Sequence, residues 1–518
     1  GATVNTISAG KDNTTISGDS TNKGEVNELK TDASTDAHNI TISNTTVNKI
    51  TAGTGNDTIT LGEGGALGNA NNTTIDLKEG QNTLTVNSGG DISALTKLDM
   101  GDNGNATLTI NEGAKLGTTT IELGSAATTG TGNKNTVTLK ANGENLTING
   151  TSSDEEINVS GADSKLGTLN VGTGKTTINL TGNSEITKIK ADTSSQEIVN
   201  ITGTGTVGEI IAGTGQDRYI AESGITIQKY MGNSNLDQLN LKGAKVNTIQ
   251  AGSGETKIIL SGGGSVDEIQ ANDNDDFTLN ISGDTVAADK VSTITGSDTL
   301  DTISVTKATV TTLNAGANST NLTLSGAAVV TSLNVTKDNS TIDLTSTDSG
   351  EISKLSTNGG TGTHTINVGD KIDINALDAG TGNDILNIKN GGKISAASLD
   401  FSGGNNTLSV ASGGDINTLT SINMGDNGSA NITIENGAKL GTTTINLGTA
   451  GTGAKNTFTL KANGENLDLS GSSSLDEITI SGNGSKLGKL NAGENKTIIN
   501  LADSGAITSL KAADNTNE

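Results

Sequence analysis

The chain has 518 residues, a formal net charge of −25, and no cysteine, proline or tryptophan. The acidic charge excludes the basic footprint that nucleic acids and anionic membranes require of a partner, so we expect neither to be bound. The lack of cysteine excludes disulfides and thiol chemistry. We also expect no transmembrane segment, because no apolar run reaches the roughly 18 residues that a spanning helix needs.

Short runs of β-branched and aliphatic residues, such as TLTV and TTINL, recur along the whole chain. They argue against disorder, since disordered chains are poor in these residues. Each run alternates apolar and polar residues and is followed by a corner rich in Gly, Asn and Asp, which tolerate positive φ. A line of about 18 to 28 residues cannot bury its apolar face alone, whereas stacked lines can. The sequence therefore predicts an all-β fold, one elongated parallel β-solenoid of about 23 coils over residues 1–518, with a core too narrow for large rings.

A larger repeat overlies the coils. TLTVNSGGDISALTKLDMGDNGNATLTI, which begins at Thr83, reappears as TLSVASGGDINTLTSINMGDNGSANITI from Thr407. With a repeat length of about 326 residues, residues 2–197 are matched by 327–518, and 198–326 are not duplicated. The chain starts without Met and stops within the repeat, so we expect it to be a window cut from a longer tandem array.

A glycine-rich motif with one aspartate occurs three times, as AGTGNDTIT at 52–60, AGTGQDRYI at 212–220 and AGTGNDILN at 379–387. It resembles the nonapeptide GGxGxDxUx of calcium-binding β-rolls, found in RTX-type bacterial secreted proteins, adhesins and surface-layer proteins. The resemblance implies Ca²⁺ ligands at the aspartates and at the glycine carbonyls before them. These ligands would be Asp57, Asp217 and Asp384, with the carbonyls of Gly53, Gly55, Gly213, Gly215, Gly380 and Gly382.

A second interpretation of these aspartates stays open. The motifs stand alone and not in tandem, so no ion can be gripped between two successive turns, and the aspartate can instead cap backbone amides in a tight corner. Two further acidic clusters also have two possible interpretations: their carboxylates are either solvated or bridged by calcium. They comprise Asp273, Asp275 and Asp276 in ANDNDDFTL, and Asp298 and Asp301 in GSDTLDT.

Other chemistry-bearing side chains are sparse. The only aromatic cluster, with Arg218, Tyr219 and Tyr230, lies in the non-duplicated middle. We interpret it as a surface insertion or a lateral contact, with a sugar site as the alternative. His38 and His364 occupy one position of the repeat and lack any metal-motif context, so we expect both to be solvated.

Thr-x-Thr pairs could stack into an outward ladder of threonines. Flat threonine arrays suggest ice-binding solenoids, but the varying length of the coils weighs against that interpretation. The pairs are Thr83 and Thr85, Thr107 and Thr109, and Thr136 and Thr138.

These observations favour a structural function without enzymatic activity. We expect an extracellular protein that forms a layer or fibre on a bacterial cell surface by self-assembly, with Ca²⁺ as the only cofactor in view. Its partners would be further copies of itself and, secondarily, host or cell-surface glycans. The stalk or passenger of a bacterial adhesin is the alternative. A polysaccharide-active β-helix enzyme centred on Arg218 and Tyr219 is a weaker third hypothesis.

Overall fold

The computed structural model describes residues 1–10, 13–31, 35–69, 73–125, 134–161, 163–191, 195–233, 235–272, 275–358 and 361–513. These residues form a parallel β-solenoid of about 23 coils, which confirms the predicted fold class. They contain no helix, and so none that could cross a membrane. The chain forms two compact units, Gly1–Gln250 and Ala251–Glu518. One continuous solenoid through both units stays a prediction.

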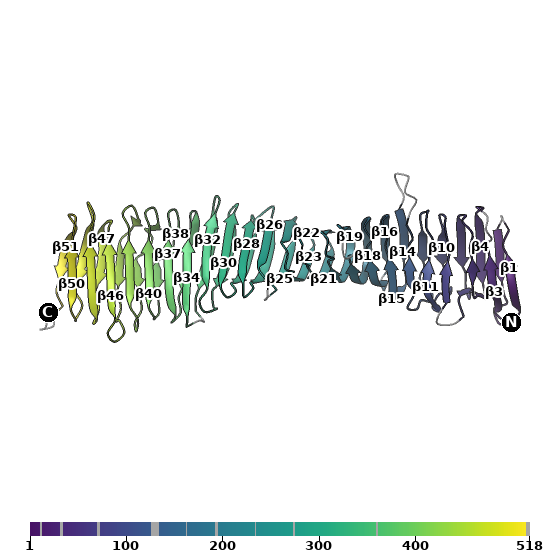
Figure 1. Cartoon of the computed structure of the whole chain (residues 1–518), viewed down its shortest axis with the longest axis horizontal. Coiled ribbons are helices and arrows are strands. Elements are labelled where there is room, and N and C mark those ends of the chain that lie inside the picture. Colours follow the sequence, from purple (N-terminus) through teal and green to yellow (C-terminus); the bar gives the residue numbers. More distant parts are fainter. Residues whose placement is uncertain are drawn as a thin grey trace. The chain divides into compact units, whose positions relative to one another are not determined.

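Most strands of the first unit are short, and Figure 1 labels some of them. The strands of this unit are β1 (Thr3–Ser8), β2 (Asn13–Ser17), β3 (Gly24–Lys30), β4 (His38–Ser43), β5 (Thr45–Val47), β6 (Ile50–Thr51), β7 (Asp57–Leu61), β8 (Ala66–Leu67), β9 (Thr73–Asp76), β10 (Thr83–Val86), β11 (Leu95–Asp99), β12 (Thr107–Ile110), β13 (Thr120–Glu122), β14 (Lys134–Leu139), β15 (Asn142–Asn149), β16 (Asp154–Ser160), β17 (Lys165–Asn170), β18 (Lys175–Lys190), β19 (Ile198–Ile211), β20 (Arg218–Glu222), β21 (Ile225–Met231), β22 (Asp237–Lys242) and β23 (Lys245–Gln250).

The second unit continues in the same style. Its strands are β24 (Thr256–Ser261), β25 (Ser265–Gln270), β26 (Phe277–Ser282), β27 (Lys290–Thr295), β28 (Leu300–Thr306), β29 (Thr309–Asn314), β30 (Ser319–Ser325), β31 (Ala328–Asn334), β32 (Thr341–Ser346), β33 (Gly350–Ser356), β34 (Thr363–Val368), β35 (Ile372–Ile374), β36 (Leu377–Asp378), β37 (Asn383–Ile388), β38 (Lys393–Ile394), β39 (Ser398–Asp400), β40 (Asn406–Val410), β41 (Asp415–Ile416), β42 (Ser421–Asn423), β43 (Ala430–Ile434), β44 (Lys439–Leu440), β45 (Thr443–Asn446), β46 (Lys455–Leu460), β47 (Asn463–Ser470), β48 (Leu475–Ile480), β49 (Lys486–Asn491), β50 (Thr497–Leu501) and β51 (Ala506–Lys511).

Each strand pairs in parallel with the corresponding strand of the next coil. In the first unit β7, β10, β12, β14 and β16 form one such stack, and β9, β11, β13, β15 and β17 form another. The second unit repeats this arrangement with β37, β40, β43, β46 and β48 on one face and β39, β42, β45, β47 and β49 on another. Short strands such as β38, β41 and β44 add a third row in some coils. Within each unit Figure 1 shows the resulting side-by-side strands.

The coils differ in length, but the parallel pairing of strands between adjacent coils is kept. His38 and Asp57, which are partners in adjacent coils, are 19 residues apart, whereas Ala106 and Asn135 are 29 residues apart. The strands of both coils stay paired residue by residue. Length differences are therefore absorbed at the corners, outside the strands.

Some corners can be formed only by glycine. Gly101 has a φ of 90°, and a Cβ there would lie 2.0 Å from the carbonyl oxygen of Lys78 in the preceding coil. Gly425, its counterpart in the second copy of the repeat, has a φ of 78° and the same close approach to Phe401. Both the backbone conformation and the spacing between coils exclude a side chain at this corner.

The core consists of the inward Ile, Leu and Val side chains of every coil. All five aromatic side chains also lie in it, so the prediction of a core too narrow for large rings is wrong. Facing strand stacks leave room for a ring because stacked sheets lie about 10 Å apart. These fully buried aromatic residues are Tyr219, Tyr230, Phe277, Phe401 and Phe458.

Candidate functional site

The aspartates of the three glycine-rich motifs point into the solenoid. Asp57, Asp217 and Asp384 have exposed fractions of 1%, 1% and 3%. Asp57 and Asp384 each occupy the first inward position of a strand, before the aliphatic residues that fill the core. A carboxylate buried here must find hydrogen-bond donors within the protein.

Two of these aspartates are paired with the histidines of the preceding coil. His38 Nδ1 lies 2.9 Å from Asp57 Oδ1, and His364 Nδ1 lies 3.0 Å from Asp384 Oδ1. Parallel register brings each pair together, since β4 pairs with β7 and β34 with β37 so that His lies opposite Asp. An ionised carboxylate can only accept, so the imidazole Nδ1–H donates. Both histidines are buried, and the prediction that they are solvated is wrong.

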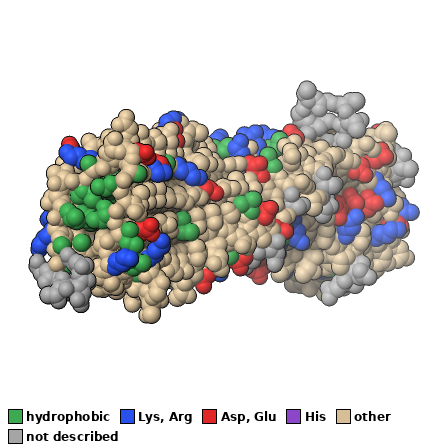
Figure 2. Space-filling model, turned by 60° about the vertical axis from the view of Figure 1, so that its left-hand side comes forward, with side chains coloured by type: hydrophobic (Ala, Val, Ile, Leu, Met, Phe, Trp, Pro, Cys, Tyr) green, Lys and Arg blue, Asp and Glu red, His purple; other side chains and the backbone are tan. Residues whose placement is uncertain are grey.

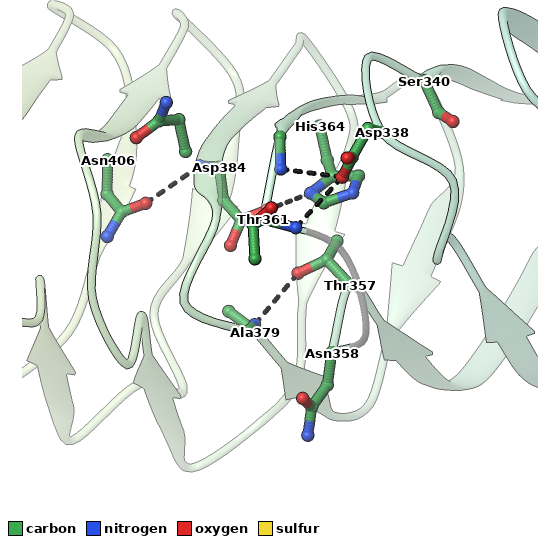
Figure 3. A network of polar contacts seen from close by, with 12 residues as sticks. Asp338, Ser340, Thr357, Asn358, Thr361, His364, Ala379, Asp384 and Asn406 are labelled. Carbon is green, nitrogen blue, oxygen red and sulfur yellow. Dashed lines mark hydrogen bonds and ion pairs between the residues drawn. The ribbon is translucent and has the colours of Figure 1, made fainter.

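The hydrogen bonding continues into the following coil through asparagine. The backbone N–H of Asp57 donates to Asn82 Oδ1 at 2.9 Å, and Asn82 Nδ2 donates to the carbonyl oxygen of Met100 at 3.0 Å. Figure 3 shows the same arrangement in the second copy, where Asp384 N–H donates to Asn406 Oδ1 at 2.9 Å. His, Asp and Asn thus link the buried corners of three successive coils. In the second copy His364 Nε2 and Asp384 Oδ2 have no hydrogen-bond partner among the described residues, whereas in the first copy Thr31 donates to Asp57 Oδ2.

We call the buried polar residues at this first inward position the polar row. They share burial and hydrogen bonds to the adjacent corner or coil. Those that recur in both copies of the repeat are His38, Asp57, Asn82, Asn135 and Glu155 in the first unit and His364, Asp384, Asn406, Asn456 and Asp476 in the second.

Asp217 shows the capping arrangement that was the second interpretation of the motif. Its carboxylate accepts the backbone N–H of Gly213, four residues earlier, at 2.9 Å, and that of Glu197 at 3.1 Å. A buried acid that caps the amide four residues before it recurs at other corners. These pairs are Glu155 with Thr151, Asp237 with Asn233, Asp301 with Ser297, and Asp476 with Ser472.

Sequence reasoning missed most of these capping acids, although a signal was present. An acid at the start of a strand or just before it, four residues after a small or polar corner residue, describes NGTSSDE and SGSSSLD as well as AGTGQD. Burial raises the pKa of Glu155 from 4.5 to about 7 and that of Asp237 from 3.8 to about 6. These two carboxyls can therefore hold a proton near neutral pH.

The second acidic cluster is only partly open to description, because Asp273 lies outside the described residues. Asp275 accepts a hydrogen bond from Asn272 Nδ2 at 2.8 Å, and Asp276 is exposed. In the third cluster Asp298 is exposed while Asp301 is buried, so these two do not face each other.

Within the described residues no group of three or more His, Cys, Asp or Glu side chains is arranged to hold a metal ion. Calcium binding at Asp57, Asp217 or Asp384 stays a prediction, and each of these carboxylates already accepts hydrogen bonds from the protein.

The aromatic cluster does not form a surface site. Tyr219 and Tyr230 are core residues, with ring centroids 5.6 Å apart and an edge-to-face angle of 74°. The prediction that they belong to a surface insertion is therefore wrong. Arg218 is exposed, and it points away from Tyr219 because adjacent residues of a strand face opposite sides.

No protein family, no curated protein and no solved structure matches this chain.

Proposed function

We propose that the chain is an extracellular structural protein whose solenoid coils self-assemble into a layer or fibre on a bacterial cell surface. The observation that carries this proposal is the parallel pairing of strands from coil to coil, which stacks equivalent strands over many coils within each unit. A stack of this kind presents unpaired strand edges wherever it ends, and such an edge is a template for a further strand.

The outer surface of the solenoid is mainly uncharged and polar, with small groups of charged side chains, as Figure 2 shows. Such a surface suits a structural protein whose side faces meet water.

The partner that we propose is a further copy of the same protein. Two different ends of the stack of coils would then meet head to tail. Such an interface does not close on itself and generates a filament.

The test is electron microscopy of the purified protein over a range of concentrations. We expect filaments or sheets at high concentration and shorter assemblies on dilution. Dispersed protein at every concentration would contradict the proposal and favour the adhesin stalk.

Calcium forms a separable part of the proposal. We expect assemblies prepared in millimolar calcium to loosen in excess chelator if the acidic surface is ordered by cations. Assemblies that keep their order in chelator would remove calcium from the mechanism and leave the head-to-tail contact in place.

A further inference from the structure

The outer face of four adjacent strands in the first unit carries a regular array of threonines. β7, β10, β12 and β14 each present two, and parallel pairing aligns them in two ranks. We call this the threonine array. Its members are Thr58 and Thr60, Thr83 and Thr85, Thr107 and Thr109, and Thr136 and Thr138.

The hydroxyl groups of the array are open to solvent. Each of the eight residues is partly exposed, and none has a side-chain hydrogen bond or ion pair to another described residue. None of the eight positions is charged, in a chain with 32 basic and 57 acidic residues. Charged residues border the array at β14. Lys134 and Lys140 stand two residues from Thr136 and Thr138, and Glu156, which lies opposite Thr136, pairs with Lys134. The array is thus an uncharged surface of methyl and hydroxyl groups.

The spacing of the array is set by the backbone. Adjacent coils lie about 4.8 Å apart, and residues two apart in a strand lie about 6.7 Å apart. A tetrahedral water network with an O···O distance of about 2.75 Å has second neighbours about 4.5 Å apart and a perpendicular repeat of about 7.3 Å. The spacing between coils exceeds the second-neighbour spacing of the water network by about 0.3 Å. Over the three steps between four coils this difference adds up to about 1 Å, well under one O···O distance. The two lattices therefore stay in phase across the array.

The varying length of the coils was the argument from the sequence against ice binding. It does not disturb the array. Thr107 and Thr136 belong to the longest coil, yet they remain direct partners in the ladder. Length differences lie at the corners, and the flat face between the corners keeps its register.

We propose that the threonine array binds the surface of crystalline water. Hydroxyl groups can join the lattice as donors and acceptors, and the methyl groups between them restrict the water that they contact. A macromolecular partner fits the array less well, because protein contacts rely on Trp, Tyr and Arg and nucleic acids on basic residues. This inference is independent of the self-assembly proposed above.

The test uses the full chain, fluorescently labelled, and polycrystalline ice grown slowly from buffer. We expect the protein to be taken into the growing ice and to slow ice recrystallisation. Thr83→Lys/Thr85→Lys should reduce both effects at least tenfold, because the charges interrupt the centre of the array. Exclusion of the natural chain from ice, as for an unrelated acidic protein, would overturn the proposal.

The second copy of the repeat supplies the matched control. Thr407 and Ser409 occupy the positions of Thr83 and Thr85, but their neighbours include Ile385 and Asn431, so the array is interrupted there. Thr407→Lys/Ser409→Lys should change ice uptake less than twofold, and equal losses in both double variants would contradict a site in the first unit.

A conservative variant guards against misfolding. Thr83→Val/Thr85→Val keeps the shape of the strand face, suits a β-strand and removes two hydroxyls. With circular dichroism unchanged, we expect a several-fold loss of ice uptake. Full uptake by this folded variant would show that the hydroxyls are not used and would overturn the proposal.

Discussion

The two copies of the large repeat keep the same His–Asp–Asn contacts inside the solenoid, whereas half of the threonine array has changed on the outer face. At the inward positions His38, Asp57 and Asn82 are matched by His364 and Asp384 and by a second asparagine, Asn406, with hydrogen-bond distances that agree within 0.1 Å. On the outer face four of the eight array threonines are kept, as Thr407, Thr433, Thr457 and Thr459, and the other four have changed. Thr58, Thr60, Thr85 and Thr107 are replaced by Ile385, Asn387, Ser409 and Asn431.

The difference shows where the fold constrains the sequence. An inward polar residue must match both the space and the hydrogen-bonding groups of two neighbouring coils, so few residue types fit. An outward residue needs only to suit a pleated, half-exposed surface. The uninterrupted threonine array of the first unit is therefore not a requirement of the solenoid.

We expect the largest loss of stability in either copy when the carboxylate of the His–Asp pair is removed. Asp57→Ala leaves His38 and Thr31 without their buried acceptor and should lower the unfolding free energy of that region by about 3 kcal/mol. Native-state hydrogen exchange at β7 would measure it. Asp384→Ala should cost a similar amount at β37, and a loss below about 1 kcal/mol in either copy would contradict a structural role for the pair.

The pKa of Glu155 gives the next effect. Because its pKa is raised from 4.5 to about 7 in the folded protein, the folded state holds a proton that the unfolded state releases between these values. The contribution of Glu155 to stability should therefore be fully present below pH 4.5 and should fall by about 3 kcal/mol as the pH rises through this window.

Urea unfolding of the natural chain and of Glu155→Gln at pH 5 and pH 8 would measure this contribution. Gln keeps an acceptor for the Thr151 amide but does not titrate, so its stability should depend less on pH. An identical pH dependence in both proteins would refute the assignment.

Removing one asparagine of the polar row should have a smaller effect. Asn82→Ala leaves the Asp57 amide and the Met100 carbonyl without partners, at a cost of about 2 kcal/mol. Asn406→Ala tests the same contacts in the second copy, and urea unfolding should show similar losses. The proposal of equivalent roles fails if only one of the two variants is destabilised.

The smallest effect is expected from exchanging an outward residue between the copies. Thr58→Ile gives the first copy the residue that stands at Ile385 in the second, and it should change the unfolding free energy by less than about 0.5 kcal/mol. The same urea titration applies, and a loss comparable with that of Asn82→Ala would show that the outer face is constrained after all.

The sequence was sufficient for the fold because period-two runs and glycine corners recur in every coil. The alternation of inward and outward residues along a strand also indicated that the histidines are buried. In HNITI and DTITL the His and Asp stand two residues before an inward isoleucine, so both share its side of the strand. The prediction of solvated histidines followed the general tendency of this residue type and not the alternation along the strand.

The remaining features depend on which coil lies against which. The hydrogen bond from the Asp57 amide to Asn82 spans 25 residues, and its existence follows only from the register of two coils of unequal length. The raised pKa of Glu155 likewise follows from burial between coils. Neither can be inferred from a local window of the chain.

The separation of strand register from corner length has a consequence for how such a chain can change. Two coils that differ by ten residues, as the 19-residue and 29-residue spacings do, keep the same ladder. Insertions at corners are therefore nearly neutral for folding, and a foreign peptide of about ten residues could be grafted at one. Grafts at successive corners would be displayed at intervals of about 4.8 Å. The solenoid would then be a scaffold that presents several copies of a peptide at a fixed spacing.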